Sequence, residues 1–359
     1  MKILYLTPTV YDEGGVARVL SIKTNHFIEA CGHEVYILTS NNETTSFFYD
    51  FNRKVNVIDC KTNGFKPFRI LDYYKKVKSY LDRIQPDLIV ICDFGWKGFC
   101  FNLFVKSKAK IVFEIHGSKY NETRKQSFDF LNSLRAYLRV TLLKTFEKRV
   151  FLSEHSREEW QLEGEIIPNP VSFRSEVTSN LTQKRVISIA RHSYEKGIDR
   201  LLQIWSKVVQ EKKDWVLDIY GNGHLLDEHL AMADSLDITT SVNFYAPVKN
   251  IQDKYLESSI YVMTSRSEGF PMVLLEAQIM GLPIVAYDCP VGPRTIIENG
   301  NNGYLCRTED DFVQKMKTLM EDIELRKRIG SEGNSSVKQF GIEPIMSKWE
   351  ALFNDLIST

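Results

Sequence analysis

The sequence lacks any apolar run that approaches the roughly 18–20 residues of a membrane-spanning helix. The apolar start, residues 1–6, is too short for a signal peptide and is expected to be a first buried strand. Six cysteines are present, but they are scattered, with no Cys-x-x-Cys pair and no clustered His. This spacing is typical of buried cysteines in a reducing compartment rather than of a disulfide frame or a zinc site. Together these absences predict a cytoplasmic protein.

Net charge is also absent, since 46 Lys and Arg balance 46 Asp and Glu, yet the charges are unevenly distributed. Residues 60–150 hold 19 basic against 8 acidic side chains, so this segment carries +11 and the remainder carries −11. A basic first half is expected to face an anionic partner, such as a membrane surface, a lipid phosphate or nucleic acid. A hydrophobic content of 43% is ordinary for a globular protein, and the length of 359 residues predicts two domains.

What is present is a repeated alternation of short strands and amphipathic helices. In the first half the expected strands are 3–6, 34–39, 55–58, 88–92 and 111–115, with helices such as 16–30 and 70–84 between them. In the second half the expected strands are 186–190, 216–220, 242–245, 260–264 and 283–286, and a closing helix is expected over 345–356. Short buried strands that alternate with helices predict parallel, doubly wound sheets.

Two prolines interrupt this alternation in the run Ile-Ile-Pro-Asn-Pro-Val over 166–171, which predicts an extended crossing. We therefore predict an α/β protein of two Rossmann-like, doubly wound domains. The first covers residues 1–168 and the second residues 186–340, and a C-terminal helix over 341–359 is expected to return to the first domain. A ligand is expected in the interdomain cleft, at the carboxyl ends of the strands.

The most informative segment is Ser-Glu-Gly-Phe-Pro-Met-Val-Leu-Leu-Glu over 267–276. Pro271 suits the first turn of a helix, which places Glu268 just before that helix and Glu276 inside it. The free amides at 272–274 and the positive end of the helix dipole suit a diphosphate. The two acids are too far apart to share a proton, but they suit hydroxyl groups at opposite ends of an elongated ligand. The plain alternative is a capped surface helix with two exposed acids.

This segment, followed by Ala-Gln-Ile-Met-Gly-Leu-Pro-Ile-Val-Ala over 277–286, resembles the signature of glycosyltransferase family 4. The resemblance spans essentially the whole chain. It implies the GT-B fold, a nucleotide-sugar donor, transfer with retention of anomeric configuration, and no metal or other cofactor. It assigns Glu268 to a hydroxyl of the donor sugar and Glu276 to the ribose. Backbone amides between them are expected to meet the sugar and the phosphates, at Gly269, Phe270, Met272, Val273 and Leu274.

Two cations lie in the run Ala-Arg-His-Ser-Tyr-Glu-Lys-Gly over 190–197, between an expected strand and a helix. Arg191 and Lys196 are suited to neutralise the charge that develops on a leaving diphosphate, in place of a divalent metal. Members of the resembled family place an Arg and a Lys in this way. A solvated basic loop is the alternative. The sequence contains no Asp-x-Asp metal motif.

Two features of the first half also follow expected strands. Gly14 and Gly15 let a ligand approach the backbone closely, and the equivalent loop in the family faces the donor phosphates, so Gly15 is a predicted donor contact. His116 ends a strand in Glu-Ile-His-Gly, and family members carry a His-Gly close to the reacting carbon, where the His donates or positions. Both positions also fit ordinary structural roles. The loop lacks Gly-x-Gly-x-x-Gly, which does not favour dinucleotide binding.

Three further loops of the second half are candidates. Gly221, in Tyr-Gly-Asn-Gly, is expected to lie against a flat base, and Val248 is the expected backbone contact to the base edge, although both equally fit ordinary turns. The run Cys-Pro-Val-Gly-Pro from Cys289 resembles a subgroup of the family that builds bacterial exopolysaccharide, capsule and lipid-linked oligosaccharide, amylovoran-type transferases among them. It implies a rigid loop beneath the donor site, without chemistry by the thiol.

Basic and apolar residues interleave over 119–149. Helices with this pattern lie on anionic membrane surfaces, although a solvated basic face over ordinary core packing explains it equally well. The basic residues concerned are Arg124, Lys125, Arg135, Arg139, Lys144, Lys148 and Arg149.

The sequence therefore predicts a retaining, metal-independent hexosyltransferase of bacterial surface polysaccharide synthesis. It is expected to move a hexose or N-acetylhexosamine from a nucleotide sugar, with UDP favoured, to a saccharide or lipid-linked saccharide acceptor. Peripheral contact with the inner face of the cytoplasmic membrane is expected, and a nucleic-acid partner is not. One rival is a sugar-nucleotide epimerase of the same fold. The other is a non-enzymatic binding protein that uses the basic half, which lacks aromatic RNA-binding motifs.

Overall fold

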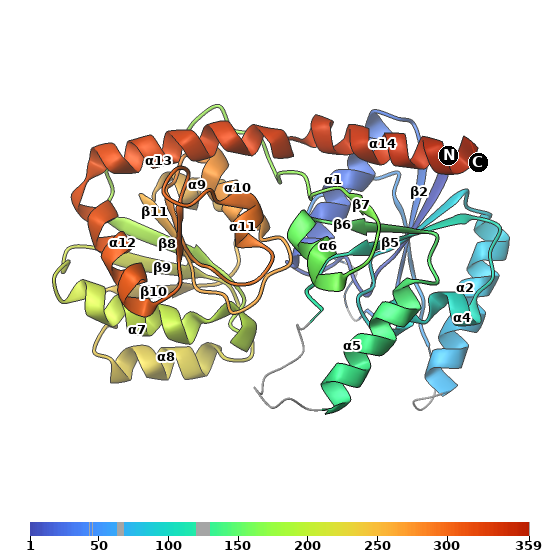
Figure 1. The fold of residues 1–359 in the computed structure, drawn as a ribbon, viewed down its shortest axis with the longest axis horizontal. Helices are drawn as coiled ribbons and strands as arrows, with labels where there is room; N and C mark the ends of the chain where they lie inside the picture. The colour runs from blue at the N-terminus through green and yellow to red at the C-terminus, as the bar shows by residue number, and fades with distance from the viewer. Residues whose placement is uncertain (43, 45, 63–67, 120–129, 359) are drawn as a thin grey trace. The chain divides into compact units, whose positions relative to one another are not determined.

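The computed structural model describes residues 1–358 apart from 43, 45, 63–67 and 120–129. The chain divides into two compact units, Met1–Pro170 together with Ile342–Thr359, and Val171–Gly341. Each unit is a parallel sheet with helices on both of its faces (Figure 1). The prediction of two doubly wound α/β units is confirmed.

The first unit has a seven-stranded sheet in the order β3-β2-β1-β4-β5-β6-β7. The order reverses between β1 and β4, which makes this the topological switch point where α/β proteins bind ligands. Apolar side chains cover both faces of the sheet and form two cores. The strands are β1 (Lys2–Leu6), β2 (Glu34–Thr39), β3 (Asn56–Asp59), β4 (Leu88–Ile91), β5 (Lys110–Ile115), β6 (Lys148–Phe151) and β7 (Glu165–Ile166). The helices are α1 (Gly15–Glu29), α2 (Phe68–Ile84), α3 (Trp96–Phe99), α4 (Phe101–Phe104), α5 (Phe130–Leu143), α6 (Glu154–Trp160) and α14 (Ile342–Ser358).

The second unit has a six-stranded sheet in the order β10-β9-β8-β11-β12-β13, with its switch point between β8 and β11. The strands are β8 (Arg185–Ile189), β9 (Val216–Tyr220), β10 (Val242–Tyr245), β11 (Ile260–Met263), β12 (Ile284–Tyr287) and β13 (Tyr304–Cys306). The helices are α7 (Ile198–Val209), α8 (Leu226–Ser235), α9 (Ile251–Leu256), α10 (Met272–Ile279), α11 (Pro293–Ile296), α12 (Glu309–Glu321) and α13 (Ile323–Ser336), with 3-10 turns η1 (Tyr194–Lys196) and η2 (Val337–Phe340).

The expected strands are confirmed to within one residue at each end. Most of them are buried apolar runs, whereas β3 and β10 are mainly half-buried or exposed. Three strands were not predicted. β6 begins with two charged residues, Lys148 and Arg149, so it does not have the apolar pattern of a strand. β7 and β13 are only two and three residues long, which is too short to form a recognisable pattern. The closing helix α14 extends beyond the expected 345–356 at both ends, lies within the expected 341–359, and packs on α1 within the first unit.

A buried histidine pair holds the loop after β8. Nδ1 of His192 lies 2.8 Å from Nδ1 of His229, and both rings are buried. One imidazole donates its N–H and the other accepts, so a proton on the accepting nitrogen would set two donors against each other. Burial, with the neighbouring imidazole, lowers the pKa of His192 to about 4. Burial likewise lowers the pKa of His229.

This pair makes stability depend on pH. The unfolded chain binds protons at these histidines near pH 6.5 and the folded chain does so only at lower pH. The free energy of unfolding therefore falls as the pH drops from about 6.5 toward 4. We expect His229→Gln to make that decrease smaller, because it removes one of the two titrating imidazoles. Urea unfolding between pH 4 and 7 measures it, with His155→Gln, at a half-buried histidine of the first unit, as the control. An unchanged pH slope in His229→Gln would contradict the assignment.

Candidate functional site

An ion pair lies at the switch point of the second unit. Lys196 follows β8 and Glu268 follows β11, and these strands are neighbours in the sheet. Nζ of Lys196 lies 2.7 Å from Oε1 of Glu268, and Oγ of Ser265 donates to the same oxygen at 2.6 Å. The Lys196 side chain is 23% exposed. The structure thus brings together two of the predicted catalytic residues at the sheet edge where ligands bind.

Arg191 lies in the same loop as Lys196 and is the more exposed cation, with 61% of its side chain accessible. Its Nη2 is 3.4 Å from Oε1 of Glu195, four residues along the chain. A long, exposed pair of this kind contributes little to stability, so the guanidinium is able to turn to an anionic ligand at small cost. Arg191 and Lys196 therefore form a basic loop at the switch point.

Helix α10 begins at Met272, with Pro271 as its N-cap. The amide of Leu274 donates to the Pro271 carbonyl at 3.0 Å, so the expectation of a free amide is wrong at that residue. The side chain of Phe270 packs edge-on against Phe340, with ring centroids 5.7 Å apart. Phe270 is therefore a core residue, and only its backbone is suited to contact a ligand. Gly269 and Val273 are half-buried beside it.

Both glutamates of the motif are buried, which excludes the plain alternative of two exposed acids. Glu276 is 0% exposed and Glu268 is 8% exposed. Oε1 of Glu276 accepts from Oγ of Ser172 at 2.7 Å, and Oε2 accepts from the Tyr255 hydroxyl at 3.0 Å. Burying a carboxylate costs free energy unless hydrogen bonds compensate it. The sequence analysis did not identify Ser172 or Tyr255, because no local pattern links them to residue 276.

The loop from Cys289 packs directly on this motif. A Cβ at Gly292 would lie 2.7 Å from Pro271 Cδ and 2.9 Å from Glu268 Cβ, so only glycine permits this approach. Val291 forms a parallel β-bridge with Glu268. Burial raises the pKa of the Cys289 thiol to about 12, so the thiol stays protonated. Cys289 also lines a cavity of about 570 Å³ together with Ser265 and Arg294.

The fold by itself explains Gly221. Its φ is +156°, and a Cβ would lie 2.0 Å from the carbonyl oxygen of Ala190, so no other residue fits. The contact between Gly221 and a base therefore stays a prediction. Val248 lies half-buried in the segment that follows β10, and its predicted base contact likewise stays a prediction.

In the first unit, Gly15 and His116 lie at the carboxyl edge of the sheet. Gly15 is the first residue of α1, and a Cβ there would meet nothing within 4 Å, so the fold does not itself require glycine. His116 follows β5 and is 8% exposed. A Cβ at Gly117 would lie 2.8 Å from the Phe94 ring, which explains the glycine after the histidine.

A fully buried ion pair lies behind His116. Nζ of Lys23, on α1, is 2.7 Å from Oε2 of Glu114, on β5, and the side chains are 0% and 1% exposed. The Lys23 ammonium also lies 3.5 Å from the centroid of the Trp349 ring, on α14. Nε2 of His116 is 3.5 Å from the same Glu114 oxygen and has no hydrogen-bond partner among the described residues. The sequence analysis missed Lys23 and Glu114 as site residues.

Electrostatics keep Glu114 ionised. Burial alone raises the pKa of this carboxyl, but the Lys23 ammonium and then His116 more than offset that effect and hold the pKa well below its usual range. Burial, followed by the Glu114 charge, raises the pKa of the neighbouring Tyr5 hydroxyl. A permanent buried carboxylate is thus aligned with Nε2 of His116.

The basic stretch only partly matches the expectation of a basic surface. Arg124 and Lys125 lie outside the described residues. Arg139 is 3% exposed and lies over the rings of Phe94, Trp96 and Phe99, so the expectation that it faces a membrane is wrong. Arg149 is half-buried and donates to backbone carbonyls. Exposed residues of α5 include Leu134, Arg135, Tyr137 and Leu138. Within the described ranges, we find no helix whose length and apolarity suffice to cross a bilayer.

Known proteins resemble both halves of the chain. Residues 13–173 match the family described as Glycosyltransferase Family 4, and residues 172–336 match Glycosyl transferases group 1. An uncharacterized glycosyltransferase of Haemophilus influenzae is 28% identical and the amylovoran biosynthesis glycosyltransferase AmsD of Erwinia amylovora is 27% identical; each alignment covers 98% of this chain and 99% of the relative.

The solved structure of a mutant of Staphylococcus aureus TarM, in complex with fondaparinux, alpha-GlcNAc-glycerol and UDP, shares the fold. It superposes with a TM-score of 0.82 at 17% identity, over 98% of this chain and 99% of that one. These similarities do not favour the epimerase or the binding protein. Two consecutive family matches, on two parallel-sheet units of the GT-B class, show that the chain belongs to the glycosyltransferases of family 4.

Proposed function

We propose that this glycosyltransferase moves a hexose or N-acetylhexosamine from a UDP-linked sugar to a saccharide acceptor, with retention and without a metal. The observation that carries the proposal is the Lys196–Glu268 ion pair at the switch point of the second unit, directly before helix α10. Support for UDP comes from the structural relative solved with that nucleotide. A role in bacterial surface polysaccharide synthesis is supported by the amylovoran relative.

In this proposal the second unit binds the donor. Arg191 and Lys196 bind the diphosphate and neutralise its charge as it leaves, in the role that a divalent metal has in other transferases. Lys196 contacts Glu268 at the same time, so one ammonium links the phosphate to the acid that holds the sugar hydroxyl. Glu276 binds the ribose hydroxyls, taking them in exchange for the Ser172 hydroxyl that it holds in this structure.

The acceptor hydroxyl attacks the anomeric carbon on the face from which the diphosphate departs. The new C–O bond forms as the bond to the diphosphate breaks, and the hydroxyl proton passes to the leaving phosphate oxygen. In this proposal His116 keeps the role that the family resemblance gives it, close to the reacting carbon. The Glu114 carboxylate lies 3.5 Å from Nε2 of His116, and in this proposal its charge orients the imidazole ring. Lys23 keeps Glu114 ionised for this purpose.

For a lipid-linked acceptor, helix α5 is the proposed membrane contact. Leu134, Tyr137 and Leu138 are spaced three and four residues apart and therefore share one helix face. They are exposed by 42%, 67% and 42%, and Arg135 lies beside them. An apolar face with an adjacent cation is suited to the interface of an anionic bilayer.

The function is tested by incubating the full chain with UDP-, GDP- and ADP-linked hexoses and N-acetylhexosamines in the presence of EDTA. We expect slow hydrolysis and a thermal shift with a UDP-sugar, because the site supplies its own cations. Lys196→Ala should abolish both responses, while Lys212→Ala, a remote surface lysine paired with Glu321, should retain them. A response that appears only after metal is restored would contradict metal independence, and no response to any sugar nucleotide would contradict the donor assignment.

Replacing Glu276 with Gln tests the ribose contact. Gln keeps the volume but loses the charge, and hydrogen bonds to a charged group contribute about 1.5–3 kcal/mol. We expect the donor Kd, measured by calorimetry, to weaken by about 10- to 100-fold. Ser172→Ala is the matched control: it removes the structural partner and leaves the carboxylate, so affinity should not fall. If the folded Glu276→Gln variant bound the donor as tightly as the wild type, the assignment of Glu276 to the ribose would be wrong.

The positioning role of Glu114 is separable from its structural role. Glu114→Gln leaves Lys23 buried and unpaired, which should cost about 3–5 kcal/mol of stability. The double variant K23M/E114Q removes both charges and should recover most of that stability. Its kcat should stay about tenfold below wild type with donor KM unchanged, because His116 has lost its carboxylate. Wild-type kcat in the double variant would show that the pair serves packing alone.

A further inference from the structure

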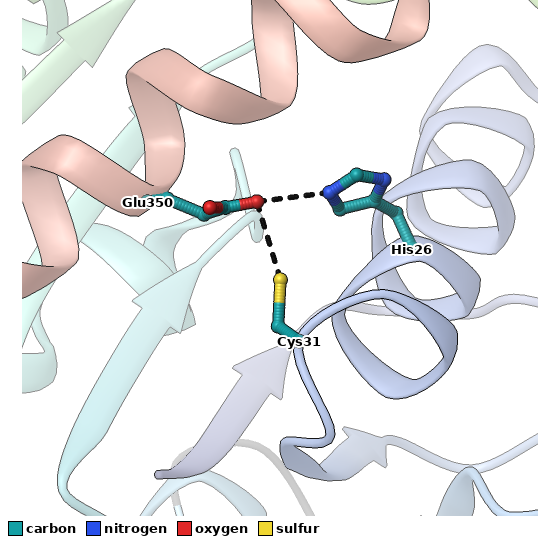
Figure 2. A group of neighbouring side chains, drawn as sticks. All are labelled: His26, Cys31 and Glu350. Atoms are coloured by element: carbon teal, nitrogen blue, oxygen red, sulfur yellow. Dashed lines mark hydrogen bonds and ion pairs between the residues drawn. The ribbon is translucent and has the colours of Figure 1, made fainter.

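A second group of polar side chains in the first unit lies apart from the proposed transfer site. His26 is in the last turn of α1, Cys31 follows that helix, and Glu350 is on α14. Figure 2 shows the imidazole and the thiol both directed at one carboxylate oxygen. Nε2 of His26 lies 2.9 Å from Oε1 of Glu350, and Sγ of Cys31 lies 3.2 Å from the same atom. Segments more than 300 residues apart in sequence thus converge on one point.

The spacing of these atoms suits a tetrahedral metal ion. Zinc binds imidazole nitrogen and carboxylate oxygen at about 2.0–2.2 Å and thiolate sulfur at about 2.3 Å. Neighbouring ligand atoms around a tetrahedral ion are then roughly 3.3–3.6 Å apart. The two contacts measured here are shorter than that by a few tenths of an ångström, and all three ligand atoms lie within 4.8 Å of one another. Small side-chain rotations therefore convert the hydrogen-bonded trio into three ligands.

The charges and the solvent exposure of His26, Cys31 and Glu350 also suit a divalent cation. A thiolate, a carboxylate and a neutral imidazole carry two negative charges, which balance one divalent cation. The side chains of His26 and Glu350 are 17% and 38% exposed, so the ion has a path from solvent and a water has room to complete the coordination. The carbonyl end of α1 carries a partial negative charge that favours a cation.

The other such group in the described residues provides a contrast. Cys92, Glu114 and His116 also bring three ligand atoms together. There the Lys23 ammonium already lies 2.7 Å from the shared Glu114 oxygen and supplies the positive charge. No lysine or arginine of the described residues forms a salt bridge with Glu350, whose ion-pair partner is His26.

We propose that His26, Cys31 and Glu350 bind one divalent transition-metal ion of the zinc class, which ties α14 to α1. The ion is structural, and the proposal does not depend on the transfer reaction or its metal independence. The Cys31 thiol donates a hydrogen bond to Glu350 in this structure, and it loses its proton to solvent when the sulfur binds the ion.

Cobalt(II) titration of the tag-free, chelator-treated full chain tests the proposal. Thiolate coordination to cobalt gives a sulfur-to-metal charge-transfer band in the near ultraviolet, and tetrahedral coordination gives intense visible bands. We expect both to saturate at about one equivalent and to disappear when zinc is added. Zinc should also raise the melting temperature by about 2 °C or more.

Cys31→Ser is the decisive variant, because it keeps the size of the side chain and removes the sulfur. It should lose the charge-transfer band and the zinc-dependent rise in melting temperature. Cys100→Ser, at a half-buried cysteine of the same unit, should keep both. Glu350→Gln should weaken cobalt binding at least tenfold with normal circular dichroism. Absence of the band in wild type, or its persistence in Cys31→Ser, would overturn the proposal, and the trio would then be a hydrogen-bonded contact alone.

Discussion

Parallel pairing of the strands is the constraint on which the candidate site depends. Because all strands of a sheet run in one direction, the loops after β8 and β11 emerge at the same edge, and Lys196 meets Glu268 there. The reversal of strand order separates the helices on either side of this point and leaves room for a ligand. The first unit repeats the arrangement with β1 and β4, and Gly15 follows its first strand. One topological rule therefore places polar residues from distant parts of the sequence on one edge of each sheet.

Three buried carboxylates are compensated in three ways. Glu114 pairs with a buried ammonium, Glu268 with a partly exposed one, and Glu276 accepts from two hydroxyl groups. Buried ion pairs contribute little net stability compared with apolar residues of similar size. Their presence is therefore better explained by what the charges do than by what they add to folding. Hydroxyl partners are the easiest to exchange for ligand hydroxyls, which agrees with the proposed role of Glu276 as a ribose contact.

The sequence predicts local structure better than it predicts partners. Short apolar, β-branched runs identify most strands within one residue, even where the strand is only partly buried, as β3 is. β6 was not identified because it begins with Lys148 and Arg149. The motif residues Glu268 and Lys196 are recognisable from the local runs 267–276 and 190–197, which resemble those of family 4. Their partners are not: Ser172 is 104 residues from Glu276, and Lys23 is 91 residues from Glu114, so only the fold brings them together. The same holds for His26, Cys31 and Glu350, whose spacing matches no metal motif. The proposed metal site is therefore not recognisable from the scattered cysteines of the sequence.

The return of α14 to the first unit has a consequence for the order of folding. Trp349 covers the Lys23 ammonium, and Ile345, Met346 and Phe353 complete the core against α1. During synthesis at about 5–20 residues per second, this cover emerges from the ribosome roughly 10–50 s after β5. Throughout that interval the core between α1 and the first sheet lacks these side chains of α14. The core of the first unit is therefore complete only once residues 342–358 have been synthesised.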